Sequence, residues 1–288
     1  MNLPPNTPIE ASGWPYYGGS YRLVRPLLQL LPPDTSRIVE PFCGSAVFSL
    51  NVPWLPRVVN DKNGDVIHLL RVIREQPDEL AWLLARTPYH QAEFAIAVLP
   101  IPSDCSDLER ARRLFVRYGM ARGGGGQELL MSDWSRSISE TRRGMMGAVA
   151  KFRSRIQRLD TLAARLADVQ FEWGDFADLT RYDHPHTFWF LDPPWEPQTR
   201  VAYAGERYEY EFTPSDYERL ATFAHTLQGR VLVLGYRGGI MSDLFQAWPT
   251  ISFDIVLSAG QSRAQREVIA WVNPPLAACL NLTTGDQP

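Results

Sequence analysis

The chain has 288 residues, enough for one large domain or for a domain that carries a sizeable insertion. Its 45% hydrophobic and 21% charged residues are ordinary for a soluble globular protein, and the absence of a run of about 18 apolar residues argues against a membrane span. The net charge is −3, and three scattered cysteines argue against a disulfide framework or a structural zinc site and favour a reducing cytoplasm. The polar, proline-rich stretch 1–13 lacks the pattern of a signal peptide.

The first patterned stretch, residues 14–31, is predicted to be a glycine turn followed by a helix. The turn reads Trp-Pro-Tyr-Tyr-Gly-Gly-Ser, and an apolar period from Leu23 to Leu31 predicts a helix that ends at Pro32-Pro33. Two interpretations of the turn stay open. Ser20 is either the N-cap of the helix, or backbone N–H groups at the helix N-terminus are presented to a ligand.

Residues 37–73 are predicted to form two strands, each followed by a helix. The first strand, 37–42, leads through Cys-Gly-Ser-Ala into a helix from Val47, which is typical of a nucleotide-binding βα unit although G-x-G-x-x-G is absent. On its own, this turn is better explained as ordinary βα chemistry. The second strand, 57–61, ends in Asp61, about 20 residues after the first turn and well placed for ribose hydroxyls. With the helix that begins at Asn63, these elements predict the first half of a Rossmann-like sheet.

The stretch 78–166 is predicted to be helical and basic, with no strand. Between 110 and 166 there are thirteen basic and four acidic residues, a net charge of +9 against −12 for the rest of the chain. This asymmetry is typical of a polyanion site, although arginines on a solvated helix face would also explain it. A Ser/Thr/Gly-rich stretch around Arg142-Arg143 favours nucleic acid, while Gly123–Gly126 lacks the Lys-Ser/Thr of a phosphate loop. The candidate DNA-binding residues are Arg122, Arg136, Arg142 and Arg143.

The sheet is predicted to resume at 169–173, in a strand that ends in Gly-Asp-Phe. Asp175 is therefore another acid at the carboxyl end of a strand. It suits an adenine amino group, with Phe176 against the ring, and it also suits the N-cap of a helix over 176–182. The two interpretations are compatible.

The apolar strand 187–191 and the Asp-Pro-Pro-Trp after it form the most informative stretch. Prolines cannot pair in a sheet, so Asp192 is left at the carboxyl end of a central strand, where open α/β sheets bind ligands. The Asp192 carboxylate and the Pro193 carbonyl can both accept from one amine, while Trp195 stacks on a planar ring. A proline-rich turn in which Trp195 merely packs is the alternative.

The remaining predicted elements complete an α/β pattern. They are a tyrosine-rich loop (Tyr203, Tyr208, Tyr210), a helix capped at Thr213–Asp216, a strand at 230–234, a helix at 240–248, an antiparallel pair at 251–257 and 268–272 with a polar loop at 258–266, and a loose tail at 274–288.

Together these motifs resemble the Dam-like, D12-class DNA adenine-N6 methyltransferases, which use S-adenosylmethionine. The resemblance is carried, in the family's order, by YYGGS (16–20), VEPFCGSAVFSLN (39–51), VVND (58–61), GDF (174–176), LDPPW (191–195) and EVIAWVN (267–273). It covers most of the catalytic core and is weak between 78 and 166. Three departures stand out: Ser20 replaces the family lysine, Ala46 the last glycine of the cofactor motif, and Trp195 the usual tyrosine.

Position by position, the resemblance implies a full set of site residues. Tyr17, Gly18, Gly19, Phe42 and Gly44 border the methionine end of the cofactor, Asp61 takes the ribose hydroxyls, and Asp175 and Phe176 meet the cofactor adenine. Asp192, Pro193, Pro194 and Trp195 form the catalytic corner. With lysine absent, a positive group is either missing or supplied by Arg22 or Arg25.

We therefore expect a Rossmann-like class I methyltransferase fold with a mostly helical DNA-recognition insertion. Residues 1–76 and 167–288 are expected to form the S-adenosylmethionine-binding domain, and 77–166 a basic target-recognition insertion. The expected reaction methylates N6 of a flipped-out adenine in double-stranded DNA, without a metal. An RNA base N-methyltransferase and a catalytically silent DNA-binding protein of the same fold are the alternatives. We expect a cytoplasmic monomer, and a cognate restriction enzyme remains an open partner.

Overall fold

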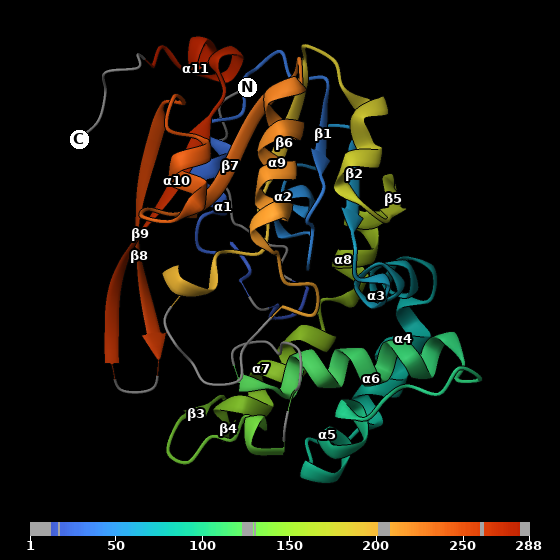
Figure 1. The fold of residues 1–288 in the computed structure, drawn as a ribbon. Helices are drawn as coiled ribbons and strands as arrows, with labels where there is room; N and C mark the ends of the chain where they lie inside the picture. Colours follow the sequence, from blue (N-terminus) through green and yellow to red (C-terminus); the bar gives the residue numbers. More distant parts are fainter. Residues whose placement is uncertain are drawn as a thin grey trace.

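The computed structural model describes residues 13–16, 18–122, 129, 131–200, 208–259 and 262–282. Its centre is a seven-stranded sheet in the order β5-β2-β1-β6-β7-β9-β8 (Figure 1). The strands are β1 (Arg37–Glu40), β2 (Arg57–Asp61), β5 (Val169–Trp173), β6 (Thr187–Leu191), β7 (Arg230–Tyr236), β8 (Thr250–Ala259) and β9 (Ser262–Val272). The first five pair in parallel, and β9 is antiparallel to both β7 and β8. This is a doubly wound sheet closed by an antiparallel hairpin, which confirms the predicted Rossmann-like methyltransferase fold.

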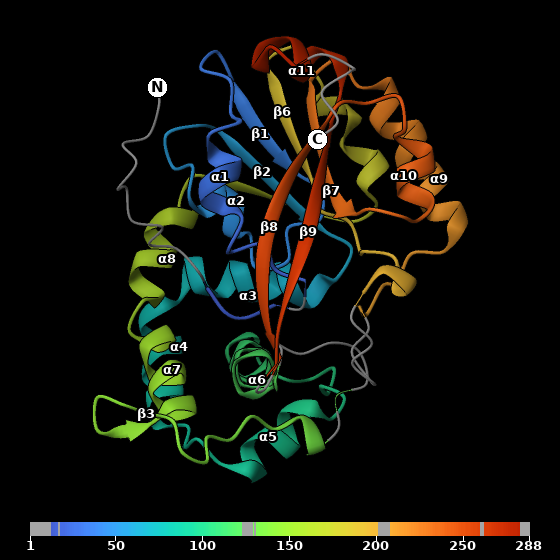
Figure 2. The same ribbon diagram turned by 90° about the vertical axis from the view of Figure 1, so that its left-hand side faces the viewer.

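Both faces of the sheet are covered by helices because its central strands are apolar on both sides (Figure 2). In β6, Phe188 and Phe190 pack in the cluster with α1 (Val24–Leu28), α2 (Val47–Leu50) and α11 (Pro274–Leu280). The alternate residues, Trp189 and Leu191, pack in the cluster with η3 (Phe176–Tyr182), α9 (Pro214–Thr226) and α10 (Ile240–Leu244). The strand that carries the Asp-Pro-Pro-Trp motif is therefore held rigidly from both sides.

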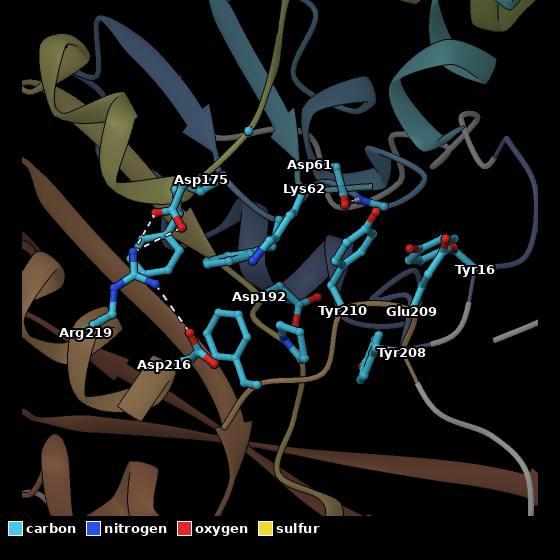
Figure 3. A pocket seen from close by; sticks show the side chains of 18 residues that line it. Tyr16, Asp61, Lys62, Asp175, Asp192, Tyr208, Glu209, Tyr210, Asp216 and Arg219 are labelled. Carbon is cyan, nitrogen blue, oxygen red and sulfur yellow. Dashed lines mark hydrogen bonds and ion pairs between the residues drawn. The ribbon is translucent and has the colours of Figure 1, made fainter. Parts of the chain in front are cut away.

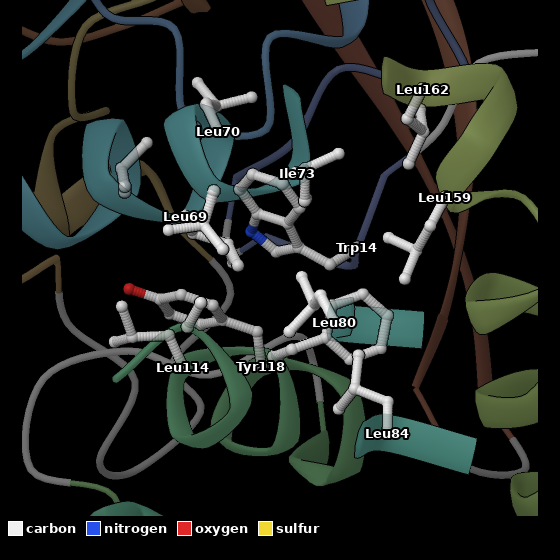
Figure 4. Close-up of a cluster of buried hydrophobic side chains, with 14 of the residues drawn as sticks. Trp14, Leu69, Leu70, Ile73, Leu80, Leu84, Leu114, Tyr118, Leu159 and Leu162 are labelled. Atoms are coloured by element: carbon white, nitrogen blue, oxygen red, sulfur yellow. The ribbon is translucent and has the colours of Figure 1, made fainter. Parts of the chain in front are cut away.

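The segment between β2 and β5 is mostly helical and lies at the lower end of the molecule in Figure 1. It contains α3 (Gly64–Glu75), α4 (Pro77–Arg86), α5 (Gln91–Val98), α6 (Asp107–Met120), α7 (Gly147–Ile156) and α8 (Leu159–Leu166). The buried side chains of these helices form one hydrophobic cluster together with residues of strands β2 and β5. Trp14 lies inside it, stacked on Tyr118 of α6 at 6.3 Å between ring centroids (Figure 4). The division at residue 77 stays a prediction, because the apolar packing is continuous across it.

Two expectations for the chain before residue 167 are wrong. The segment predicted to lack strands contains a hairpin of β3 (Thr141–Arg142) and β4 (Met145–Met146). Its two turn residues, Arg143 (φ 52°) and Gly144 (φ 74°), have the left-handed backbone that two-residue hairpins need, but strands this short leave no periodic signal. The first helix ends at Leu28 rather than Leu31, and its N-cap is Leu23 rather than Ser20.

The C-terminal part is more ordered than expected. Strands β8 and β9 continue through the predicted loop 258–266 to the pair Ala259 and Ser262. The expected tail contains α11, whose N-cap Asn273 accepts from Leu276 N at 3.1 Å. A helix of seven residues is too short to show a clear period, whereas its asparagine cap and following prolines were readable signals. Within the described ranges, no helix is both long and apolar enough to cross a membrane.

Candidate active site

A pocket of about 730 Å³, part of it open to solvent, lies where strands β1, β2, β5 and β6 end (Figure 3). Its size is typical of a site for a cofactor-sized molecule. Of the predicted site residues, its wall brings together Gly18, Phe42, Gly44, Asp61, Asp175, Phe176, Asp192 and Pro194. Gly19, Pro193 and Trp195 adjoin it in the chain without lining it, and Tyr17 lies outside the described residues. Predicted site residues separated by up to 176 positions in the sequence, Gly18 and Pro194, thus meet in one cavity.

Glycine is required at two points of the wall. Gly18 has φ 75°, and a Cβ there would overlap the hydroxyl of Tyr208. Gly44 has φ 48°, and a Cβ there would lie 2.7 Å from Cδ1 of Tyr16. Both positions therefore combine a left-handed backbone with a close approach that no side chain permits. Ala46 also has a left-handed backbone (φ 51°), so the alanine that departs from the family pattern occupies a position that favours glycine.

Asp61 is fixed at the end of β2 by backbone donors. Gly44 N donates to Oδ2 and Asn63 N to Oδ1, both at 2.9 Å. Burial raises the pKa of Asp61 to about 6, against the lowering effect of these two N–H groups. Each carboxylate oxygen keeps a lone pair, so Asp61 can still accept hydrogen bonds from ligand hydroxyls inside the pocket.

Asp175 and Phe176 form the far wall with an arginine that the sequence did not single out. Asp175 caps η3, accepting from Ala177 N at 3.0 Å, which confirms the structural interpretation of this acid. Arg219 of α9 lies 3.1 Å from both Asp175 oxygens, and its guanidinium lies 5.3 Å from the centre of the Phe176 ring. Phe42 lies 5.4 Å from Phe176, centroid to centroid, so two aromatic rings border the pocket here.

Asp192 receives a hydrogen bond from a neutral donor, because the Trp195 indole N–H donates to Oδ1 at 2.9 Å. Burial raises the pKa of Asp192 to about 7, while this hydrogen bond lowers it. The Trp195 ring is half-buried and lies edge to face against Tyr236 at 4.4 Å, so it packs and also contacts the predicted catalytic acid.

A third acid, Glu40, is fully buried next to the site. Its carboxyl accepts from the backbone N of Ser49 at 3.1 Å and from the Ser49 hydroxyl. Burial raises the pKa of Glu40 to about 8, and repulsion by Asp192 and Asp61 adds to the rise. The residue belongs to the Val-Glu-Pro-Phe motif, but nothing in that pattern indicated a buried, neutral acid.

The segment after the catalytic corner supplies pocket residues that sequence reasoning missed. Tyr208, Glu209, Tyr210 and Phe212 all line the pocket. Glu209 accepts from Asn63 Nδ2 at 2.7 Å, which joins this segment to the start of α3. The tyrosine-rich composition was visible in the sequence, but composition does not show which way a loop folds. Tyr203 lies outside the described residues.

The four candidate DNA-binding arginines are all exposed. Arg142 and Arg143 lie at the tip of the β3–β4 hairpin, and Arg136 lies over the Trp134 ring at 5.5 Å. Arg122 donates to the Ser132 carbonyl, and Ile138, between these arginines, is 89% exposed. The same surface therefore presents cations and an apolar side chain to solvent. The described residues include no group of His, Cys, Asp or Glu arranged to hold a metal ion.

The doubly wound sheet, with a small-residue turn after β1, acids at the ends of β2 and β5 and Asp-Pro-Pro-Trp after β6, defines the class of the fold, which is the Rossmann-like methyltransferase fold. More narrowly, the family model of the D12 class N6 adenine-specific DNA methyltransferases matches residues 16–95, which confirms the resemblance seen in the motifs.

Two curated relatives agree with this family. The modification methylase StsI of Streptococcus sanguinis is 25% identical over 192 residues, covering 62% of this chain and 28% of that protein. The DNA N-6-adenine-methyltransferase of Escherichia phage P1 is 23% identical over 245 residues, covering 80% of this chain and 30% of that protein. The chain thus spans under a third of the length of either relative. Among solved structures, TrmN from Thermus thermophilus matches with a TM-score of 0.35 and 14% identity, over 88% of this chain and 50% of that one.

Proposed function

We propose that this chain transfers a methyl group from S-adenosylmethionine to the N6 amine of adenine in double-stranded DNA. The observation that carries the proposal is the position of Asp192, which follows the central strand β6 and lines the same pocket as Asp61 and Phe176. An acceptor for an amine and a wall suited to a nucleoside therefore share one cavity. The family match and the printed names of the two relatives support DNA adenine as the substrate.

The chemistry of the pocket fits S-adenosylmethionine. Asp61 and Asp192 are half-buried carboxyls whose hydrogen bonds come from neutral donors, so their negative charge suits a sulfonium cation. Asp61 has lone pairs left for the ribose hydroxyls. Phe42 and Phe176 present aromatic faces to the adenine, and Asp175 accepts a hydrogen bond from the adenine amino group. Gly18, Gly19 and Gly44, with Tyr17, border the methionine end. The bound cofactor supplies the electrophilic methyl group.

The catalytic corner holds the target amine. The Asp192 carboxylate accepts one of its N–H groups, and the Pro193 carbonyl, in a turn fixed by Pro194, accepts the other. Two acceptors draw the nitrogen lone pair out of conjugation with the ring and aim it for in-line attack. Trp195 provides the stacking surface for the base. Because the carboxylate is the accepting form, activity rises with pH through the Asp192 pKa of about 7.

Duplex DNA binds across the surface that carries Arg122, Arg136, Arg142 and Arg143. All four side chains are exposed, as contacts to phosphates and base edges require. The adenine is extruded from the duplex at a cost of a few kcal/mol, offset by stacking and hydrogen bonds in the pocket. The protein acts as a cytoplasmic monomer without a metal, alone or with a cognate restriction enzyme.

The test is methyl transfer from labelled S-adenosylmethionine to unmethylated genomic DNA and, in parallel, to total RNA, with nucleoside analysis of both products. We expect N6-methyladenine in DNA and a loss of about 100-fold or more in Asp192→Asn, since an interaction made in the transition state is removed. The exposed Asp254 on β8 provides the matched control Asp254→Asn, which should keep full activity. Label in RNA alone would overturn the DNA substrate. Cofactor binding without transfer to either nucleic acid would favour a silent DNA-binding protein.

A further inference from the structure

The catalytic corner after β6 has few backbone donors of its own. Its two prolines have no N–H group, so the corner depends on carbonyl oxygens and side chains for its anchoring. Two such contacts come from neighbouring elements: Tyr217 of α9 bonds the Pro194 carbonyl, and the segment after β7 bonds the Glu196 side chain. We propose that Tyr217 and Glu196 are positioning residues that anchor the chain on either side of Trp195 and so hold the indole that bonds Asp192. This inference rests on the proposed function.

Tyr217 ties the corner to α9. Its hydroxyl donates to the Pro194 carbonyl at 2.9 Å, and the residue is only 3% exposed. The ring lies edge to face against Phe212, with 5.3 Å between centroids, so the hydroxyl belongs to a ring fixed by packing. The start of α9 is itself fixed by the capping box at Thr213. The chain is thus bonded to a rigid element one residue before Trp195.

Glu196 ties the corner to the segment after β7. It is 3% exposed, and its carboxylate accepts from Ile240 N at 2.8 Å and from Met241 N at 2.9 Å. Gln198 Nε2 donates to the same carboxylate at 2.6 Å. The approach is so close that a Cβ at Gly239 would lie 2.1 Å from Oε2 of Glu196, so only glycine leaves room for this carboxylate. A buried acid with three donors is well compensated, and it fixes the chain one residue after Trp195.

Trp195 lies between the two anchored residues and transmits their effect to Asp192. Its indole N–H donates to Asp192 Oδ1 at 2.9 Å, so a shift of the backbone on either side moves the donor on the predicted catalytic acid. A misplacement of about 1 Å at a reacting group costs about 100-fold in rate. Neither Tyr217 nor Glu196 is among the described residues that line the pocket. Their effect on the reaction therefore passes through the corner and not through contact with the cofactor.

The kinetic experiment uses the full chain with Tyr217→Phe and Glu196→Gln. The first removes one neutral hydrogen bond, so we expect kcat to fall about 5-fold. The second replaces a carboxylate oxygen by an NH2 group that cannot accept, so kcat should fall about 10-fold. Gly239→Ala reaches the same contact by another route, since it places a methyl group where the Glu196 carboxylate lies, and the same fall of about 10-fold is expected. The Kd for S-adenosylmethionine, measured by calorimetry, should stay within about 2-fold of wild type in all three variants.

Two matched controls lie in the helical segment. The Tyr89 hydroxyl also donates to a backbone carbonyl, that of Ser135, and Glu109 also accepts several hydrogen bonds. Tyr89→Phe and Glu109→Gln should therefore lower stability as the corner variants do, but they should keep the wild-type kcat at saturating DNA.

A second measurement does not depend on methyl transfer. The Trp195 indole N–H is observed by NMR in protein labelled with ¹⁵N at tryptophan, with Trp195→Phe to assign its signal. In Tyr217→Phe, Glu196→Gln and Gly239→Ala its proton signal should shift upfield, because the hydrogen bond to Asp192 lengthens and weakens. The two controls should leave this signal in place.

The two measurements separate this inference from the proposed function. If wild-type protein methylates DNA adenine but the Trp195 signal stays in place in the three corner variants, the anchoring is overturned and the proposed function stands. A kcat that stays at the wild-type value while the signal shifts also overturns the positioning role, as does a loss of cofactor affinity that matches the loss of kcat. If the signal shifts as expected while wild-type protein methylates no nucleic acid, the proposed function fails and the anchoring of the corner stands.

Discussion

Charged side chains have different partners at the carboxyl edge of the sheet and in the helical segment 77–166. At the sheet edge, the buried acid Glu40 and the half-buried acids Asp61 and Asp192 accept from backbone N–H groups, a hydroxyl and an indole. In the helical segment, arginines are paired with acids: Arg112, for example, lies 2.6 Å from Glu109 and 2.7 Å from Glu93. The carboxylates of Asp61 and Asp192 can therefore pair with a cationic ligand, whereas arginines of the helical segment already pair with acids of the protein.

This difference shows that the net charge of +9 between residues 110 and 166 overstates the number of basic side chains that face solvent. Of the thirteen basic residues between 110 and 166, those bonded within the fold include Arg110, Arg112, Arg113, Arg155, Arg158 and Arg165. The exposed ones are Arg122, Arg136, Arg142, Arg143, Lys151 and Arg153. The net charge of a segment therefore counts arginines that stabilise the fold together with arginines that face solvent. Only the exposed subset, of which Arg142 and Lys151 share a surface ion pair with Glu140, can reach a polyanion.

The largest effect on stability is expected at Arg112, in the helical segment. Arg112→Ala leaves Glu93 without this partner and Glu109 with Arg113 alone, in a partly buried network of charged hydrogen bonds, so the free energy of unfolding should fall by about 2 kcal/mol. Urea denaturation measures it, and Arg142→Ala, at an exposed arginine, is the matched control, expected to change stability by less than about 0.5 kcal/mol. Equal effects of the two substitutions would contradict the division between structural and surface arginines.

The next effect belongs to the sheet edge and depends on pH. Glu40 ionises near 4.5 in the unfolded chain and at about 8 when folded, so the unfolded state releases its proton first and stability falls as pH rises between these values. Glu40→Gln removes this contribution, which is at most about 1.4 kcal/mol per pH unit. Urea denaturation from pH 5 to 8 should therefore show a flatter decline in the variant than in wild type. The exposed Glu79→Gln should keep the wild-type slope, and an unchanged slope in Glu40→Gln would mean that Glu40 is ionised in the folded protein.

The sheet could be predicted from sequence because its signals are local. The apolar run 187–191 and the prolines after it place Asp192 at the carboxyl end of a strand, whatever the rest of the chain does. The same holds for Asp61 at the end of β2 and for the capping box at Thr213. Each of these follows from neighbours in the chain, and the structure agrees with all three.

What could not be predicted depends on contacts between distant segments. The hydrogen bond from Asn63 to Glu209 joins positions 146 residues apart, and the ion pair of Arg219 with Asp175 joins positions 44 apart. The turn residues of the β3–β4 hairpin lack the Asn-Gly signal that usually marks such turns. Sequence motifs thus located the pocket, whereas the side chains that orient its acids required the fold.

The last prediction tests the exposed arginines, where the effect per residue is smallest. If Arg142 and Arg143 each contact a phosphate, the double variant Arg142→Ala/Arg143→Ala should lower the slope of log K against log salt by about 2 and weaken DNA binding without altering stability. Fluorescence anisotropy with duplex DNA at several salt concentrations measures this slope. Arg181→Ala, at an exposed arginine on η3, is the control and should keep the wild-type slope. If the control lowers the slope as much as the double variant does, the hairpin is not the DNA surface, and the basic character of the helical segment serves packing alone.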